Sequence, residues 1–303
     1  MLFVTIFWAA NFIVVKAAIH EIPPVTFAFL RFTIAAIVLL VALRVREGSA
    51  RPPAGDALAI MGLGAIGFGI YQVIWSTALQ SIPAGDSALI IAATPVLTAM
   101  LAVVAGSDVL TRLKLTGGLV SFLGVAIVVA AGPGLALGLG GGAGSGAVLI
   151  GDLLTLGAAL CWSVYTAFGA PHLRRHSPLR TTAWAMVGGC LVLAGPGLWE
   201  AASADWGHVS ASAWGGLLYS AILPAGLANV LVFHAIRLLG PTRITAYQFL
   251  VPFMAVVLGA LFLQEPIRVE QIAGGAVIVG GVALARAQPS GDLLGWIRDR
   301  LPS

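Results

Sequence analysis

The sequence predicts an all-α integral membrane protein with ten transmembrane helices, arranged as two inverted five-helix repeats. Composition is the first observation behind this fold class. Of the 303 residues, 59% are hydrophobic and only 9% are charged, and the mean hydropathy is +1.00, whereas soluble domains are about 45–50% apolar and about 25% charged. A soluble globule needs a polar shell, so lipid must cover this surface. The other two observations are ten long apolar stretches and an internal repeat.

The ten apolar stretches are long enough to cross a bilayer, which takes about 20 mostly apolar residues in a helix. They are residues 2–19, 24–43, 57–79, 84–106, 115–131, 150–170, 181–198, 213–238, 241–263 and 272–285. The first stretch has no basic segment before it and continues past the length of a signal peptide. We therefore expect it to be the first transmembrane helix.

A glycine-rich stretch without charge, residues 132–146 (GPGLALGLGGGAGSG), follows the fifth helix and predicts a flexible linker. The expected organisation is a first repeat over residues 1–131, a linker over 132–147, a second repeat over 148–287 and a tail over 288–303. The tail carries apolar residues at helical spacing beside arginines, which fits either a helix on the membrane surface or a frayed end.

The basic residues predict the orientation in the membrane. Of the 16 lysine and arginine residues, Lys16 and Arg31 fall within predicted helices and Arg268 falls in an outer loop, so the other 13 (16 minus 3) lie on the side of the N-terminus. Because cytoplasmic segments carry the excess of basic residues, we expect both termini in the cytoplasm of a cell with a bacterial-type inner membrane. The net charge is only +4 and lies in short clusters between apolar runs, which argues against nucleic-acid binding.

The second half of the chain repeats the first. A shift of 157 positions carries residues 94–131 onto residues 251–288 and superimposes a proline, an acidic residue and three glycines: Pro95 on Pro252, Asp108 on Glu265, Gly117 on Gly274, Gly118 on Gly275 and Gly124 on Gly281. Nearer the start of each half, a shift of 154 places Trp8 on Trp162. A repeat with an odd number of helices must return upside down. This predicts the inverted plan of many secondary transporters, with substrate bound near the midplane between the halves.

Several motifs resemble those of a known family. The segments WAANFIVVK (8–16), PPVTFAFLRF (23–32) and TPVLTAMLAVVAGSDVLT (94–111), followed by a glycine-rich helix, are similar to an EamA domain of the drug/metabolite transporter superfamily. The second half repeats them in CWSVY and VPFMAVVLGALFLQEPI (251–267), so the resemblance covers nearly the whole chain. Where the family usually has glutamate after the fourth helix, this chain has Asp108, and the usual residue appears only at Glu265.

The resemblance implies a transporter that exports amino acids and related metabolites, without a cofactor. The aromatic content is similar to that of the YddG-like branch, which exports aromatic amino acids. The implied partners are a small-molecule substrate and the lipid bilayer, and we expect the protein to act as a monomer. A carrier for drugs or other amphipathic metabolites is the alternative.

Nine aromatic and amide residues are candidates for the substrate site: Trp8, Asn11, Phe12, Tyr71, Gln72, Trp75, Trp162, Tyr165 and Asn229. Trp8 and Asn11 share a helix face, as do Trp162 and Tyr165 at the equivalent positions of the second half. Amides in apolar helices need partners inside the bundle. Two interpretations are open: hydrogen bonds and aromatic packing between helices, or a cavity with aromatic walls and amides that orient a polar end. We favour the cavity.

Arg31 is a tenth candidate, because it lies about 10 Å inside its helix at about 1.5 Å per residue. A charge there needs a partner or water. Either Asp86 pairs with it, or it attracts a substrate carboxylate. Lys16 is close enough to a helix end to reach the membrane interface.

Two prolines, Pro95 and Pro252, interrupt helical hydrogen bonding at equivalent places. They are candidate hinges for alternating access, or they simply shape the helices. The match to G-x-G-x-x-G at residues 62–67 lies inside an apolar stretch, so we interpret its glycines as helix-packing positions and not as a nucleotide site.

A membrane-embedded enzyme is the hypothesis from a different class. The sequence contains neither H-E-x-x-H nor G-x-S-x-G, so we predict no catalytic residue and no metal site. The acidic residues lie near helix ends or in loops, and His234 is also near an end. We therefore expect flux driven by the substrate gradient, with Asp86 as the residue most able to contradict this expectation.

Overall fold

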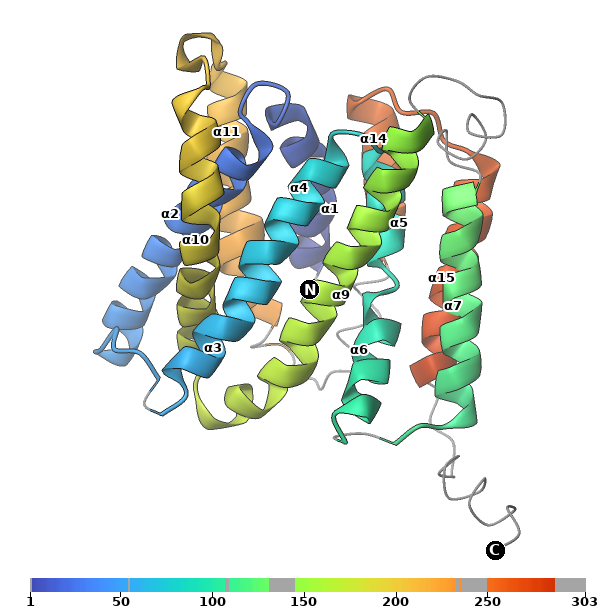
Figure 1. Ribbon diagram of the computed structural model, residues 1–303, viewed down its shortest axis with the longest axis horizontal. Coiled ribbons are helices and arrows are strands. Elements are labelled where there is room, and N and C mark those ends of the chain that lie inside the picture. Colours follow the sequence, from blue (N-terminus) through green and yellow to red (C-terminus); the bar gives the residue numbers. More distant parts are fainter. Residues whose placement is uncertain are drawn as a thin grey trace, which may run out of the picture.

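The computed structural model of the chain is a bundle of helices (Figure 1). It describes residues 2–53, 55–106, 109–130, 145–232, 235 and 250–286. Within those ranges, 7 helices are long and apolar enough to cross a membrane, and three shorter apolar helices cover Leu2–Ala18, Leu250–Phe262 and Val269–Ala285. These ten helices correspond one to one to the ten predicted stretches, so the all-α membrane fold is confirmed.

The first half contains five spans, of which the third and fourth are each divided. Its elements are α1 (Leu2–Ala18), α2 (Pro24–Glu47), α3 (Ala57–Gly64), η1 (Ala65–Ile70), α4 (Tyr71–Leu79), α5 (Ala84–Ile91), α6 (Thr94–Val104) and α7 (Arg112–Ala130). Pro24 starts α2 because its fixed φ suits the first helical position. Gly48 ends this helix with a left-handed φ of 70°, which glycine adopts without strain.

The second half follows the same order. Its elements are α9 (Ser145–Arg175), α10 (Pro178–Ala202), η2 (Trp206–His208), α11 (Ala211–Ser220), η3 (Ala221–Ala228), α14 (Leu250–Phe262) and α15 (Val269–Arg286). α9 begins five residues before the predicted start at residue 150. The predictions for Asp108, for His234, for the tail and for nearly all of the glycine-rich linker lie outside the described residues.

The two halves meet at their last helices, α7 and α15, which pack antiparallel through glycines at equivalent positions. A Cβ atom on Gly117 would lie 2.5 Å from the carbonyl oxygen of Gly281, and one on Gly124 would lie 2.7 Å from that of Gly274. The shift of 157 exchanges these two contacts, because it carries Gly117 to Gly274 and Gly124 to Gly281. A two-fold axis therefore relates the halves, as an inverted repeat requires.

The other helices follow the same symmetry. α2 packs on its counterpart α10, and α1 packs on α14 as α9 packs on α6. At the upper end in Figure 1, the Glu200 carboxylate of α10 accepts the backbone N–H groups of Val25 and Thr26 at 2.8 and 3.0 Å. These groups have no partner within their own helix, so α10 caps the first turn of α2.

The third and eighth spans each contain a π-helical segment at the equivalent place. The shift of 157 maps η1 to residues 222–227, which fall inside η3. Pro224 accounts for part of η3, because its ring can neither donate a hydrogen bond nor fit a regular turn. π-helical turns are rare and are often found at functional sites.

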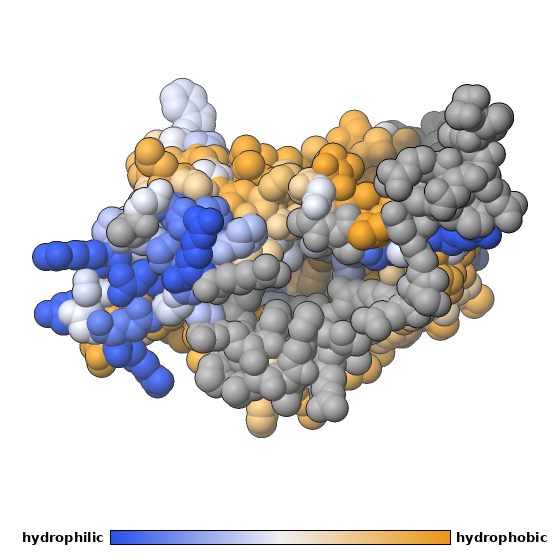
Figure 2. Space-filling view, turned by 90° about the horizontal axis from the view of Figure 1, so that it is seen from below, coloured by the Kyte–Doolittle hydropathy of each residue, from blue (hydrophilic) through white to orange (hydrophobic). Residues whose placement is uncertain are grey.

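Apolar side chains cover the sides of the bundle, and seven large ones among the described residues are at least 71% exposed: Phe3, Val45, Leu58, Val104, Trp199, Phe262 and Val269. Viewed from the lower end, hydrophilic side chains gather on the side where α2 ends and where α3 and α10 begin (Figure 2). A wide apolar flank with polar side chains at an end is what a lipid environment requires.

Candidate functional site

Six aromatic rings from α1, the third span and α9 form a continuous cluster, which we call the aromatic cluster: Phe12, Phe68, Tyr71, Trp75, Trp162 and Tyr165. Ring centroids are 5.4 Å apart for Phe12 and Trp75, 6.1 Å for Tyr71 and Trp75, and 5.8 Å for Tyr71 and Trp162. Phe68 contacts Trp162 at 5.6 Å and Tyr165 at 4.9 Å. Edge-on, tilted and stacked pairs of this kind stabilise one another beyond their buried area. Five of the predicted residues therefore come together.

The π-helical segment η1 brings α9 close enough to complete the cluster. A Cβ atom on Gly67 would lie 2.5 Å from the Cβ and Cγ atoms of Tyr165, so only glycine admits the tyrosine ring here. Phe68 is the next residue, and the sequence analysis did not identify it. The sequence signal that was available is the glycine-rich run of residues 62–69, which permits close helix packing.

A polar group borders the aromatic cluster. Arg31 on α2 is only 5% exposed, its Nε donates to the carbonyl oxygen of Ser220 at 3.3 Å, and its Cζ lies 4.9 Å from the ring centroid of Phe32. The Ser220 hydroxyl donates to Oδ1 of Asn11 at 2.6 Å. Arg31 is also close enough to Tyr71 to interact with it electrostatically. This group therefore places a buried cation beside aromatic rings.

The first of the two interpretations of Arg31, an ion pair with Asp86, is wrong. Asp86 instead binds the Arg268 guanidinium and accepts a hydrogen bond from Gln271 Nε2 at 2.7 Å. Among the described residues, no carboxylate lies within ion-pair distance of Arg31. The second interpretation of Arg31, the attraction of a substrate carboxylate, stays a prediction.

Two predicted site residues bind the backbone of η3. Trp8 Nε1 donates to the Pro224 carbonyl oxygen at 3.3 Å, and Asn229 Nδ2 donates to that of Ala225 at 2.8 Å. Both satisfy carbonyl groups in a segment without regular α-helical bonding. Trp8 also packs beside Tyr71 and Trp75 against one buried cluster of apolar residues. Gln72 is 4% exposed, and its backbone oxygen accepts a hydrogen bond from the Ser76 hydroxyl.

Both prolines lie in the first turn of a described helix. Pro95 lies in the first turn of α6, just after the break at residues 92 and 93 that separates α6 from α5. Pro252 is the third residue of α14 and is buried. Pro95 therefore lies where the fourth span is interrupted, at the place where the sequence predicts a break in helical hydrogen bonding.

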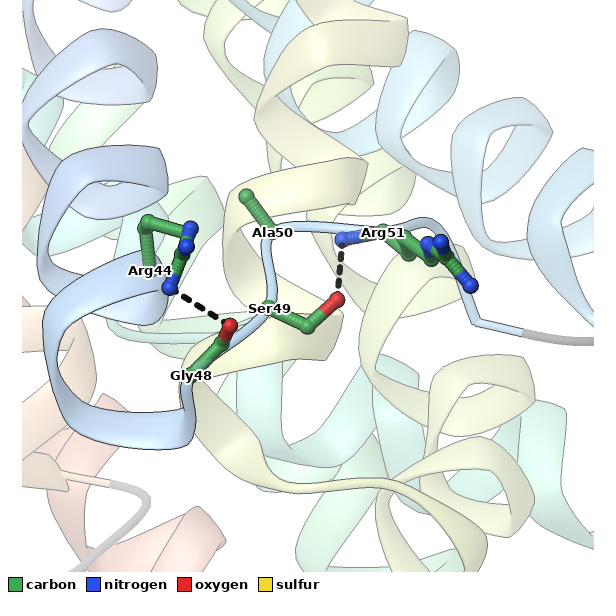
Figure 3. Close-up of a pocket in the computed structure, with 5 residues that line it drawn as sticks. All are labelled: Arg44, Gly48, Ser49, Ala50 and Arg51. Carbon is green, nitrogen blue, oxygen red and sulfur yellow. Dashed lines mark hydrogen bonds between the residues drawn. The ribbon is translucent and has the colours of Figure 1, made fainter.

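Two hollows lie away from the aromatic cluster. One of about 560 Å³ is at the lower end, where Arg44 donates to the Gly48 carbonyl oxygen at 2.6 Å and Arg51 lies alongside (Figure 3). The other, of about 330 Å³, lies between α1 and α11 and includes Val14 and Tyr219 in its lining. Neither is lined by the aromatic cluster, so neither is the predicted substrate cavity.

Charged residues tie several spans together at the upper end. Lys16 Nζ donates to Glu265 Oε1 at 2.8 Å and to the Ile82 carbonyl oxygen at 2.6 Å, so it points into the bundle instead of reaching the interface. Glu265 also accepts the backbone N–H of Ala84, the first residue of α5, at 2.9 Å. Together with the pair of Asp86 and Arg268, these contacts connect α1, α5, α14 and α15.

At the lower end, a second group links the third and sixth spans. The Asp56 carboxylate contacts His176 at 2.9 Å, His172 at 3.3 Å and Arg175 at 3.4 Å. The hydrogen bond with His176 is the main reason why the pKa of Asp56 lies below its usual range. The sequence analysis did not identify these histidines.

Comparison with known proteins gives a consistent result. Residues 1–130 and 149–287 match the EamA-like transporter family. The chain is 26% identical to the uncharacterized transporter YyaM of Bacillus subtilis, over 93% of this chain and 90% of that protein.

Two further relatives have names that refer to amino acids, and each is 27% identical. They are the probable terminal-alkyne amino-acid exporter of Streptantibioticus cattleyicolor, over 94% of this chain and 91% of that protein, and the probable amino-acid metabolite efflux pump of Salmonella typhimurium, over 93% and 91%. A solved crystal structure with 20% identity superimposes with a TM-score of 0.65 over 94% of both chains, which supports the fold.

Proposed function

The chain belongs to the EamA-like transporter family, which makes it a membrane transporter and not an enzyme, and we propose that it exports amino acids, with aromatic ones favoured. Two relatives named for amino-acid or metabolite export support this substrate class. The proposed mechanism is alternating access of one site between the two inverted halves. The protein would act as a monomer.

The observation that carries this proposal is a buried cation beside an aromatic cluster. Arg31 is buried and has no carboxylate partner among the described residues, and its guanidinium is suited to bind a carboxylate through two parallel hydrogen bonds. The rings of Tyr71, Trp75 and Trp162 offer surfaces on which an aromatic side chain can stack. A zwitterion with an aromatic side chain matches both parts, whereas a cationic drug would meet repulsion at Arg31.

Counterflow in proteoliposomes tests the substrate class. Vesicles loaded with unlabelled phenylalanine should accumulate external radiolabelled phenylalanine, because exchange requires only that the carrier alternates with substrate bound. Empty vesicles give the background, and a panel of unlabelled competitors ranks the substrates. Tryptophan and tyrosine should compete better than lysine or aspartate. Clear counterflow of a cationic drug, without counterflow of any amino acid, would contradict the proposal.

The proposed orientation places both termini in the cytoplasm and the upper end of Figure 1 outside. Arg46 and Asp205 are exposed at opposite ends of the bundle. In a background without Cys161 and Cys190, Arg46→Cys should react with a membrane-impermeant maleimide only after the cells are opened. Asp205→Cys should react in intact cells. The reverse pattern would overturn the orientation.

A further inference from the structure

A buried carboxylate on α9 has no role in the proposed substrate site. Asp152 is only 3% exposed, and its Oδ1 makes no hydrogen bond to any described residue. It lies about two turns inside α9, because this helix starts at Ser145. The neighbouring Gly151 is packed so tightly that a Cβ atom there would lie 2.7 Å from Ile82 and 3.2 Å from the Ala78 carbonyl oxygen.

Asp152 lies near the charged network of the upper end. It is close enough to Asp86 and to Arg268 to interact electrostatically with both. Asp86 is 1% exposed and already binds Arg268 and Gln271, and it interacts in turn with Glu265. The charged groups that meet here come from five separate places in the chain: Lys16 on α1, Asp86 on α5, Asp152 on α9, Glu265 after α14 and Arg268 before α15.

The charges of this network do not balance if every group is ionised. Glu265 pairs with Lys16 and Asp86 pairs with Arg268, which leaves Asp152 as the third carboxylate, without a cation of its own among the described residues. Burial of an ionised carboxylate with an oxygen that accepts no hydrogen bond is strongly disfavoured, and the group takes up a proton instead. The neutral acid of Asp152 is therefore the form that suits this environment.

We propose that Asp152 is a proton-binding site and that it couples the transport proposed above to the proton gradient. This inference rests on the proposed transport function. It replaces the expectation of flux driven by the substrate gradient alone, because that expectation placed every acidic residue near a helix end. One proton binds to a carboxylate oxygen of Asp152 and leaves as hydronium, so charge and atoms balance without another reactant.

The network also supplies a way for the proton to act on the conformation. When Asp152 loses its proton, its negative charge competes with Asp86 for Arg268. This weakens the link between α5 and α15 at the end that we assign to the outside. Protonation removes the competing charge and restores the link. The protonated state therefore favours closure of the outer end, and the deprotonated state favours its opening.

Two transport assays on the full-length protein in liposomes test this proposal. With the membrane potential clamped, an interior more acidic by one pH unit should drive about tenfold accumulation of phenylalanine if one proton exchanges for one neutral molecule. Asp152→Asn should abolish this accumulation and retain counterflow, because exchange of substrate does not require net proton movement. Asp152→Glu should restore part of the accumulation. Asp205→Asn, whose side chain is 71% exposed, is the matched control and should behave as the wild type.

Infrared difference spectroscopy provides a readout that does not depend on substrate. The wild type should show the carbonyl stretch of a protonated carboxylic acid at neutral pH, and the Asp152→Asn spectrum should lack it. Absence of this band, or full gradient-driven accumulation by Asp152→Asn, would overturn the proposal. If Asp152→Asn does not fold, the comparison of the wild type with Asp152→Glu tests the proposal. The band should be present in the wild type and shifted in Asp152→Glu, and an unshifted band would overturn the assignment to Asp152.

The two proposals fail in different ways. Counterflow of phenylalanine without any effect of the pH gradient on the wild type would leave the substrate class intact and refute proton coupling. The carboxylic-acid band without counterflow of any amino acid would support the proton site and refute the substrate class.

Discussion

Replacing Gly281 by alanine should destabilise the protein by about 1–3 kcal/mol or more, the usual cost of forcing extra atoms into a packed interface. A Cβ atom at this position would lie 2.3 Å from the backbone nitrogen of Ser121 and 2.6 Å from the carbonyl oxygen of Gly117. Both are backbone atoms, so no side-chain rotation can relieve the overlap and the helices α7 and α15 must move apart. The midpoint of thermal unfolding in detergent, followed by tryptophan fluorescence, measures the effect.

The preceding residue provides a matched control in the same helix. A Cβ atom on Gly280 would have no other atom within 4 Å, so Gly280→Ala should leave the midpoint unchanged or raise it slightly through better helix propensity. Equal destabilisation by both changes would contradict the antiparallel glycine contact.

Replacing Arg31 by methionine should reduce phenylalanine transport by roughly tenfold to a hundredfold. A hydrogen bond to a charged group contributes about 1.5–3 kcal/mol, and about 1.4 kcal/mol corresponds to a factor of ten. Methionine approximates the length of the arginine stem and removes the cation together with its hydrogen bond to the Ser220 carbonyl oxygen. Arg31→Lys should retain an intermediate activity, because an ammonium group cannot bind a carboxylate through a planar fork. Initial rates of counterflow provide the measurement, and the exposed Arg46→Met is the control.

A second substrate separates carboxylate binding from a structural role of Arg31. Phenylalaninol keeps the ring and the amine but has no carboxylate. The wild type should prefer phenylalanine over phenylalaninol, and Arg31→Met should lose that preference. If the variant transports both compounds less well by the same factor, Arg31 supports the fold and does not bind the substrate.

The sequence predicted the ten spans and the repeat because lipid makes the apolar pattern dominant. The sequence also predicted that Tyr71 and Trp75 share one helix face and that Trp162 and Tyr165 share another, because helical spacing alone is enough for this. Phe68 and Ser220 escaped prediction because their positions depend on how neighbouring helices dock. Helical periodicity within one segment carries no information about that choice.

The upper-end network was mispredicted for a local reason. Gln264 adopts a positive φ of 56°, which is uncommon for residues other than glycine. It lies just before Glu265 and Arg268, whose side chains reach back into the bundle. A charge count along the sequence treats Arg268 as an isolated charge in an outer loop, whereas it binds the buried Asp86. The sequence analysis also placed Asp152 near a helix end, whereas α9 starts five residues earlier and holds Asp152 inside the bundle. Helix ends are the least certain feature of a sequence prediction.

The two π-helical segments have a mechanical consequence. A π-turn holds one more residue than an α-turn, and its hydrogen bonds can exchange for α-helical ones by a shift of one residue. Such a step would rotate the part of the span beyond η1 by roughly 100° and slide it by about 1.5 Å. This rotation would move Tyr71 and Trp75 away from Trp162 and Phe12. Because η3 occupies the equivalent place in the inverted half, the same shift of one residue there would slide its span in the opposite direction across the membrane.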